Sequence, residues 1–356
     1  MAEVKPFRAV RYGERAGPLE ALVAPPYDVI SPEQRDQLRA RSPYNVVHLT
    51  LPDDEVEAGR LMADWRGEGI LADDAEPAYW WLSQDYVGPD GVARTREGLV
   101  AALRAEPYEN RVILPHERTH RGPKEGRLRL LRETRAQLEP LFFLYEGPPP
   151  ASRPAHEPDL QVEGARLWRI PSADIAEAFA DRQLLIADGH HRYETALAYH
   201  EEAGTPQSAY VLAVLVSLED PGLMIFPTHR VFEHVAGDSG SPYEDVDLAL
   251  ADLEGQPQGR ASGVLYRRQG IEMLQGRPGQ LDVELTDELE AEGVSYTASV
   301  DEAIESVTSG DAEGALLVRP TRVEDVYTWA QQGRVMPQKT TYFYPKLVSG
   351  LLFLPL

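Results

Sequence analysis

The segment of residues 183–200, QLLIADGHHRYETALAYH, constrains the fold more than any other part of the chain. Its apolar run at 184–186 is typical of a buried strand, and Gly189 interrupts that run. From Tyr193 onward, apolar residues recur at helical spacing. The order of these residues therefore predicts a strand, a tight turn and a helix.

The predicted turn gathers polar residues at the mouth of the helix, namely Asp188, Gly189, His190, His191 and Arg192. The first amide N–H groups of a helix lack internal partners and lie at the positive end of its dipole. With two imidazoles and a guanidinium, these donors favour an anion site suited to phosphate, and Gly189 would let the ligand approach the backbone. Two alternatives stay open. The side chains could merely decorate a surface helix, or His190 and Glu194 could hold a metal, although no third ligand is evident nearby.

Composition excludes several classes of function. The 356 residues include no cysteine, which rules out disulfides, thiolate catalysis, iron–sulfur clusters and cysteine zinc sites. The formal net charge of −23 repels phosphodiester backbones and anionic membranes, so we expect neither a nucleic-acid nor a membrane partner. No apolar span is long enough to cross a membrane, and the first residues show no signal peptide. We expect a soluble, cytoplasmic protein.

The segment 116–135 is basic within this acidic chain, with seven Lys or Arg against three Glu. Such a run is usually a solvated helix. The alternative is a second wall of an anion pocket, in which Lys124 and Arg127 would neutralise charge.

The first five residues of that segment, HERTH, match the H-E-x-x-H pattern of zinc peptidases. That pattern works by placing two imidazoles on one face of a continuous helix. Pro115 stands directly before it and Gly122-Pro123 follows closely, so barely two turns could form. We therefore expect His116 and Glu117 to line a loop beside the basic helix.

Two further carboxylates are candidates for chemistry. Asp28 follows two prolines and precedes a predicted helix in which Ser31 is the N-cap and Gln34 completes a capping box. A carboxylate fixed there could act as a general base or bind magnesium, or could only bond to its own turn. Asp188 is open to two interpretations as well, as a former of the turn or as the partner that orients a histidine.

The last segment, residues 333–356, is rich in aromatic and basic side chains, with Lys339, Tyr342, Tyr344 and Lys346 close to two prolines. A disordered tail would be poorer in aromatics, so we expect this one to be packed. Its lysines either reach the anion site or stay exposed.

Strands and helices mix throughout, which predicts an α/β fold (α+β mixed) with no repeat. We expect an N-terminal α/β region at 1–148, a central strand–turn–helix region at 159–235 and a C-terminal α/β region at 236–356. The proline-rich stretch 146–158 separates the first two. The expected helices are 32–41, 56–65, 173–181, 190–200, 245–253, 300–308 and 322–332, and the expected strands are 46–51, 78–86, 94–103, 141–145, 160–170, 184–186, 210–218, 263–268, 271–275 and 314–318.

Six segments resemble a bacterial and archaeal family catalogued as domain of unknown function 1015: APPYDVIS at 24–31, SPYNVVHLTLP at 42–52, HERTH…PK at 116–124, ADGHHRYETAL at 187–197, FPTHRVF at 226–232 and MPQKTTYFYPKLVSGL at 336–351. They extend from one end of the chain to the other. The Asp-Gly-His-His-Arg turn is also similar to the phosphate-gripping turn of the ParB/sulfiredoxin-like superfamily, which includes kinases of free serine. This resemblance implies a ParB/sulfiredoxin-like core with additional N- and C-terminal α/β elements.

Sulfiredoxin chemistry uses a cysteine in this turn, and ParB-type DNA binding needs a basic helical module; the sequence has neither. No Walker, Rossmann or G-x-S-x-G motif occurs either. The resemblance therefore implies nucleotide-dependent phosphoryl transfer to a small hydroxylated metabolite, with free L-serine favoured and ATP or ADP with Mg²⁺ as cofactor. The alternatives are a nucleotide-binding regulator without turnover and a metal-dependent hydrolase that uses His116 and His120.

In this hypothesis the residues 188–192 grip the phosphoryl oxygens, helped by Lys124 and Arg127. Asp28 or Glu117 would take the hydroxyl proton or hold Mg²⁺, and His191 would act beside them. The expected substrate contacts are Tyr27, His116, His229 and Lys339. The sequence does not indicate an oligomeric state.

Overall fold

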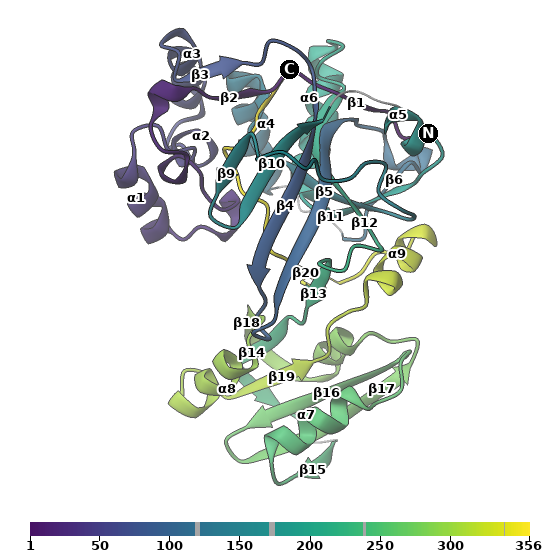
Figure 1. The fold of residues 1–356 in the computed structure, drawn as a ribbon. Helices are drawn as coiled ribbons and strands as arrows, with labels where there is room; N and C mark the ends of the chain where they lie inside the picture. The colour runs from purple at the N-terminus through teal and green to yellow at the C-terminus, as the bar shows by residue number, and fades with distance from the viewer. Residues whose placement is uncertain (118–121, 171–174, 238–239, 338) are drawn as a thin grey trace.

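The computed structural model describes residues 1–117, 122–170, 175–237, 240–337 and 339–356, apart from the side chains of 122–124. It shows two lobes, each built on its own sheet (Figure 1). Strands and helices are mixed in both, which confirms the α/β fold class. No helix in the described ranges has the length and apolar character needed to cross a membrane.

A nine-stranded mixed sheet forms the larger lobe. Its pairs are antiparallel except β12 with β8 and β11 with β6, which are parallel. In sheet order the strands are β6 Ile113–Leu114, β11 Leu184–Asp188, β8 Leu141–Tyr145, β12 Tyr210–Ser217, β5 Ala93–Arg104, β4 Tyr79–Val87, β10 Ala165–Ile170 and β9 Leu160–Val162, and β1 Val4–Lys5 pairs with β5. Strands from both sides of the proline-rich stretch 146–158 pair here, so that stretch does not separate two sheets.

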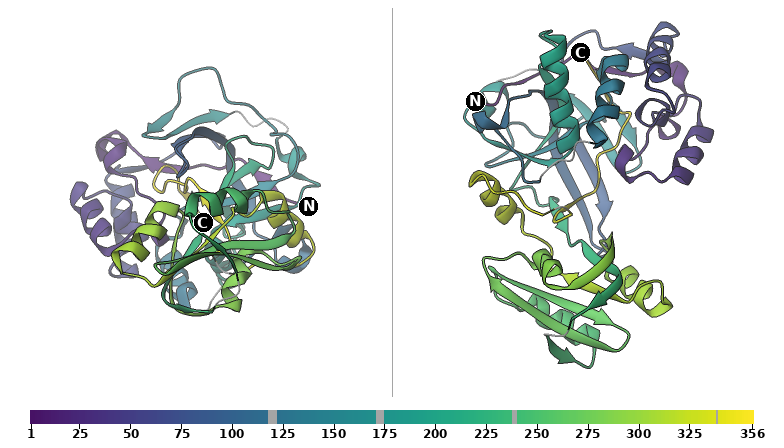
Figure 2. Two further views of the ribbon diagram at one scale, coloured as in Figure 1. Left: turned by 90° about the horizontal axis from the view of Figure 1, so that it is seen from below. Right: turned by 180° about the vertical axis from the view of Figure 1, so that it is seen from behind.

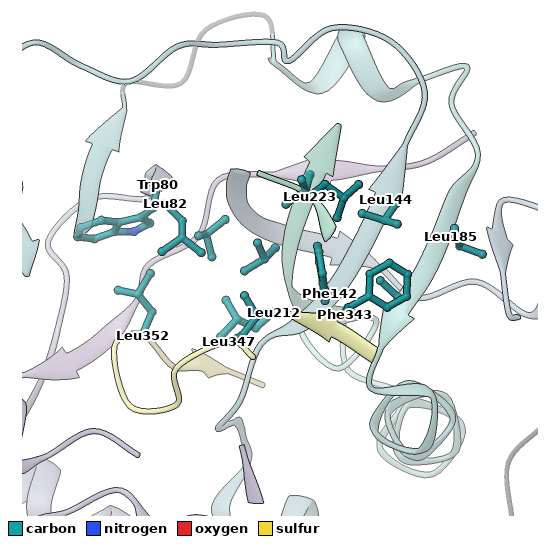
Figure 3. Packing of buried hydrophobic residues seen from close by; sticks show 14 of the residues in the cluster. Trp80, Leu82, Phe142, Leu144, Leu185, Leu212, Leu223, Phe343, Leu347 and Leu352 are labelled. Atoms are coloured by element: carbon teal, nitrogen blue, oxygen red, sulfur yellow. The ribbon is translucent and has the colours of Figure 1, made fainter. Parts of the chain in front are cut away.

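Different helices and segments pack against the two faces of the large sheet. One face packs against α5 Ile175–Phe179 and α6 His190–Ala203. The other packs against α9 Val323–Gln331 and the C-terminal tail. Phe343 of the tail packs beside Phe142 on β8 (Figure 3), and their ring centroids are 5.7 Å apart. The tail is therefore packed against the large sheet, as predicted.

Helices from the first third of the chain form a third hydrophobic cluster beside the large sheet. They are α1 Pro32–Arg41, α2 Val47–Thr50 and α3 Glu55–Gly67, and α3 packs on α4 Gly122–Thr134. In the rear view of Figure 2, α4 in turn lies beside α6. The capping box that begins α1 is present, since Ser31 Oγ accepts from the amide of Gln34 at 3.2 Å and Gln34 Oε1 accepts from the amide of Ser31 at 3.0 Å.

The smaller lobe is an antiparallel six-stranded sheet with α7 Val246–Glu254 and α8 Val300–Ser309 on one face. The 3₁₀ segment η5 Asp282–Glu288 covers the opposite face. In sheet order the strands are β15 Ser241–Tyr243, β17 Gly270–Pro278, β16 Arg260–Arg267, β19 Gly314–Val318, β14 His229–Ala236 and β18 Glu290–Thr297. This sheet therefore begins with β14, a few residues before position 236.

Short pairs join distant parts of the chain. β13 Met224–Phe226 pairs with β20 Tyr342–Tyr344 between the lobes, β2 Val10–Tyr12 pairs with β3 Leu71–Asp73, and β7 Ala136–Gln137 pairs with β21 Leu354–Pro355. The remaining 3₁₀ turns are η1 Glu14–Ala16, η2 Leu19–Ala21, η3 Tyr27–Val29 and η4 Tyr108–Asn110.

Two predicted elements are wrong in type or extent. The expected strand at 46–51 is α2, because the Asn45 side chain accepts from the amide of Val47 at 3.0 Å and donates to two backbone carbonyls of the N-terminal segment. The expected strand at 160–170 is the hairpin of β9 and β10, which turns at Gly164 with φ +72°. The edge strand β18 and the strand β20 lack an apolar alternation and were not predicted.

Candidate functional site

A cavity of about 840 Å³ lies between the two lobes. Segments that are far apart in the sequence form its wall: the turn at 27–29, the start of α6, the stretch 296–302 before and within α8, and the tail at 339–346. Glu117 and Thr228 also line it. The cavity thus brings N-terminal, central and C-terminal motifs together in one place.

The strand–turn–helix prediction is confirmed, and the start of α6 faces the cavity. Gly189 is the N-cap, with φ +99°, and no side chain caps the helix. The amides at the start of α6 are therefore not satisfied by capping side chains, which leaves them available to an anion. A Cβ at position 189 would lie 3.2 Å from Arg192 Nη2 and 3.3 Å from Leu141 Cδ2, so the glycine makes room for protein atoms. Gly189 also lines the cavity, and its role in the approach of a ligand stays a prediction.

Asp188, Arg192 and Lys346 form an ion-pair triad at the mouth of α6. Arg192 Nη2 lies 2.8 Å from Asp188 Oδ2, and Lys346 Nζ contacts Asp188 Oδ1. Each side chain is at most 20 % exposed. Burial alone would raise the pKa of Asp188, but the charges of Lys346 and Arg192 outweigh it and lower that pKa. Two cations share one carboxylate, so the triad carries a net charge of +1.

The arginine of the turn already has partners within the protein. Arg192 already pairs with Asp188, and its Nη1 donates to the carbonyl of Pro140 at 2.7 Å. The described hydrogen bonds of the Asp188 side chain go to Arg192 and Lys346, and none of them goes to a histidine. Asp188 therefore does more than form the turn. The second cation on Asp188 is Lys346, at the far end of the chain.

The tail segment that carries Lys346 is held by two side chains of the large sheet. Arg96 on β5, which is 1 % exposed, donates to the carbonyls of Tyr344 at 3.3 Å and Pro345 at 2.7 Å. Gln84 on β4 accepts from Arg96 at 2.6 Å and donates to the carbonyl of Lys346 at 3.3 Å. Burial lowers the pKa of Arg96 to about 10, which still leaves it a cation at neutral pH. These bonds fix the backbone from which Lys346 reaches Asp188.

His116 and His190 form a buried neutral pair behind the triad. Their ring centroids are 4.7 Å apart, and the amide of His116 donates to His190 Nε2 at 3.3 Å. His116 Nδ1 donates to the carbonyl of Ile186 at 2.7 Å, so its Nε2 must accept from the Thr341 hydroxyl at 2.9 Å. Burial lowers the pKa of His116 to about 4 and, with the neighbouring His116, lowers that of His190 as well.

This pairing corrects the metal interpretations of these histidines. Both ring nitrogens of His116 are engaged in hydrogen bonds, so it is not placed as a zinc ligand or as a substrate contact. His120 lies outside the described residues. Within the described ranges, no three His, Asp or Glu side chains are grouped so that they could hold a metal ion, and this includes His190 and Glu194.

Carboxylates line the same cavity as the triad. Asp28 is exposed on the 3₁₀ turn η3, and it makes no hydrogen bond or ion pair within the described residues. Glu117 is half-buried and its backbone forms an isolated bridge with Met336 of the tail. Glu302, in the first turn of α8, accepts from the Thr297 hydroxyl at 2.5 Å.

A buried acid that the sequence did not single out positions the turn of Asp28. Glu139, which is 5 % exposed, accepts from the amide of Tyr27 at 2.9 Å and from the hydroxyl of Ser349 at 3.1 Å. Arg127 lies with its guanidinium carbon 4.0 Å from the centroid of the Tyr27 ring. The turn of Asp28 is thus tied to α4 and to the tail.

The other candidates divide into two groups. Tyr27, His191 and Lys339 line the cavity with the triad. Arg127 does not, because its guanidinium packs on Tyr27 and donates to the carbonyl of Thr50 at 2.7 Å. His229 is also apart: it is 1 % exposed on β14, and its Nδ1 accepts from the amide of Val318 at 3.2 Å. The side chain of Lys124 lies outside the described residues.

Part of the cavity wall comes from residues that the sequence does not mark. The stretch Tyr296 to Ser299 and the first turn of α8 come from the smaller lobe, and no motif marks them. Lys346 carried a signal, since it lies in a basic, aromatic segment, but only the fold shows that it, more than Lys339, joins the helix mouth.

The charges of the wall indicate what the cavity can hold. Among the described residues that line it, three are Lys or Arg and four are Asp or Glu. The cations lie at the start of α6 and on the tail, and Asp28, Glu117 and Glu302 add carboxylates from other segments. Such a wall suits a ligand with a phosphate group at one end and a cation or a hydroxyl at the other.

Comparisons with known proteins place this fold among distant neighbours. A structure of a free serine kinase in complex with AMP aligns at 15% identity over 65% of this chain and 83% of that chain, with a TM-score of 0.38. A conserved hypothetical protein from Pyrococcus furiosus aligns at 16% identity over 66% and 89%, with a TM-score of 0.35. SbnI from Staphylococcus aureus, truncated at its C-terminus, aligns at 10% identity over 70% and 85%, with a TM-score of 0.33.

A search of curated proteins found no match. The sequence model of one family matches residues 4–284, which is most of the chain and includes the strand, turn and helix that form the floor of the cavity. The chain therefore belongs to the family described as protein of unknown function, DUF1015.

Proposed function

We propose that this protein binds ATP or ADP with Mg²⁺ and transfers a phosphoryl group to a small hydroxylated metabolite. The observation that carries the proposal is the triad of net charge +1 beside the uncapped start of α6. Backbone donors, a helix dipole and an unbalanced cation together favour a phosphate group. A cavity of about 840 Å³ lies within the range of cofactor sites and leaves room for a second substrate.

Mg²⁺ fits the residues that are present. A nucleotide polyphosphate carries several negative charges, and the described wall has more carboxylates than cations. Mg²⁺ in nucleotide sites is usually held by one or two carboxylates together with the phosphates and water, so a dedicated cage of protein ligands is not required. Glu117 is suited to this role because it lines the cavity on a segment paired with the tail.

Asp28 is suited to act as the base. It is exposed to the cavity and lies outside the triad, and its turn is fixed by the bond from the Tyr27 amide to Glu139. In the proposed step the acceptor hydroxyl oxygen bonds to the transferred phosphorus, the bond from phosphorus to the nucleotide's bridging oxygen breaks, and the hydroxyl proton passes to Asp28. Lys346 and the α6 amides hold the phosphoryl oxygens while charge moves between them.

L-serine is the first acceptor to test, because of the resemblance of the Asp-Gly-His-His-Arg turn. The purified protein is titrated with Mg-ATP and Mg-ADP by calorimetry and then incubated with nucleotide and L-serine while ³¹P NMR follows phosphoserine. We expect Asp28→Asn to bind nucleotide with an affinity close to the wild type and to lose at least about 100-fold in turnover, a size typical of a missing general base.

Asp36→Asn is the matched control, because Asp36 is an exposed acid on α1 that does not line the cavity. It should keep wild-type turnover. Failure of the wild type to bind any nucleotide would refute the proposal. Nucleotide binding without product across a panel of hydroxylated metabolites would instead make the protein a nucleotide-binding regulator and refute the transferase.

A further inference from the structure

A second cavity, of about 680 Å³, adjoins the first. The two share four lining residues, Val29, Tyr342, Tyr344 and Lys346, so they meet where the tail passes the turn of Asp28. One ligand can therefore reach from the mouth of α6 into the second cavity across Lys346.

The walls of the second cavity are held rigidly. Ala24 and Ser349 exchange backbone hydrogen bonds of 3.2 and 2.9 Å, which join the N-terminal segment to the tail. The next residues on the N-terminal side are Pro25 and Pro26, whose φ angles are fixed by their rings. Because these walls do not have to order on binding, they can recognise a flat ligand at low entropic cost.

The second cavity differs from the first in its chemistry. Its charged side chains balance, with Glu20 and Glu163 against Arg41 and Lys346. The rest of its wall is mainly apolar and aromatic, formed by residues that include Val29, Ile30, Leu38, Val348, Tyr342 and Tyr344. Gln37 adds an amide that has no hydrogen bond within the described residues. An uncharged heterocycle with donors and acceptors at its edge suits this lining.

We propose that the second cavity binds the base and ribose of the nucleotide, while its phosphates lie at the start of α6. This inference rests on the proposed function. The base lies against the ring of Tyr342, its edge faces Gln37, and the phosphate chain passes Lys346, which is the residue common to the triad and both cavities.

The acceptor metabolite is the competing occupant, and the placement of the reactive groups argues against it. The acceptor hydroxyl must reach both the terminal phosphate and Asp28, which lines the first cavity but not the second. A small charged metabolite would also gain little from the apolar wall. The first cavity therefore holds the acceptor and the phosphates together.

Gln37→Trp tests the inference, because Gln37 is exposed on α1 and a larger side chain there fills the second cavity without touching the first. Ala40→Trp is the control, since Ala40 is exposed on the same helix and lines neither cavity. Calorimetry measures the Kd of each protein for Mg-ATP and for Mg-tripolyphosphate, which has no base. Thermal unfolding checks that both variants fold.

We expect Gln37→Trp to weaken Mg-ATP binding at least tenfold and to change tripolyphosphate binding less than twofold, with Ala40→Trp unchanged for both. An unaltered Kd for Mg-ATP, or an equal loss for both ligands, would overturn the inference. A raised KM for the acceptor with normal ATP binding would assign the cavity to the acceptor and also overturn it. Failure of the proposed function looks different, because the wild type would then bind neither ligand.

Discussion

Lys346→Met removes the charge that makes the triad of Asp188, Arg192 and Lys346 net positive. The substitution keeps a flexible chain of similar length on the cavity wall. Asp188 and Arg192 remain paired at 2.8 Å, so the triad falls from a net charge of +1 to a neutral pair. The uncapped amides of α6 stay in place, which separates the contribution of the lysine charge from that of the helix.

The size of the effect follows from the position of the charge. Two unit charges about 4 Å apart interact by about 4 kcal/mol at an effective dielectric constant of about 20. Asp188 shares the Nζ charge of Lys346, and that side chain is 20 % exposed, so the ligand gains only part of this energy. We expect a loss of about 2–3 kcal/mol, which corresponds to nucleotide binding about 30- to 150-fold weaker. The free energy of unfolding should fall by less than about 1.5 kcal/mol, because Asp188 keeps a cationic partner.

Calorimetry with Mg-ATP gives the Kd, and urea unfolding gives the stability of the same preparation. Lys339→Met is the matched control, because Lys339 lines the cavity but is exposed and lies outside the triad. It should weaken binding by no more than about 1 kcal/mol, or roughly fivefold. If Lys346→Met binds Mg-ATP as the wild type does, or if the two variants lose equal affinity, the reasoning from the triad is refuted.

Three other substitutions test the geometry of the site. Asp188→Asn leaves Lys346 and Arg192 without their common counter-charge. Urea unfolding should show that the free energy of unfolding falls by about 3–5 kcal/mol at pH 7, and that this loss shrinks below about pH 4. A smaller loss than in Lys346→Met would contradict the role of Asp188 in the triad. Gly189→Ala should lower the free energy of unfolding by about 1–3 kcal/mol in the same assay, because φ at this residue is +99° and the new methyl group meets Arg192. An unchanged free energy of unfolding would show that the substitution causes no backbone strain. Burial holds the pKa of His116 at about 4, below its unfolded value of about 6.5, so the unfolded chain binds a proton there that the native protein does not. Stability should therefore fall as the pH drops from about 6.5 to about 4, by up to about 1.4 kcal/mol per unit, and His116→Gln should flatten that profile.

Short-range physics made part of the fold predictable from the sequence. The capping box of Ser31 and Gln34 spans four residues and depends on no distant contact, and α1 begins where it indicates. The strand at 184–188, the turn at Gly189 and the helix from His190 likewise follow from the local order of apolar residues and glycine. These elements form the floor of the candidate site, so its position was recoverable without the fold.

Contacts between distant residues were not predictable in the same way. Asn45 turns an apolar alternation into α2 through hydrogen bonds to the segment at 21–23, which no local pattern reveals. The partner of Asp188 lies 158 residues away, and the smaller lobe adds Tyr296 to Ser299 to the cavity without a motif. The tail could be predicted to pack from its aromatic content, but the bonds from Arg96 that aim Lys346 at Asp188 depend on the large sheet.

The triad also explains how the site can be stable without a bound ligand. Uncompensated cations at the start of a helix oppose its dipole and would destabilise an empty site. In the structure Asp188 compensates Arg192, and burial lowers the pKa of His190 so that it is neutral. Lys346 is a second cation on the same carboxylate, and the amides of α6 have no capping side chain. The protein can therefore fold without an anion and still have a site that attracts one. We expect Lys346 to contribute more to the affinity of that site than Arg192, His190 and His191 do.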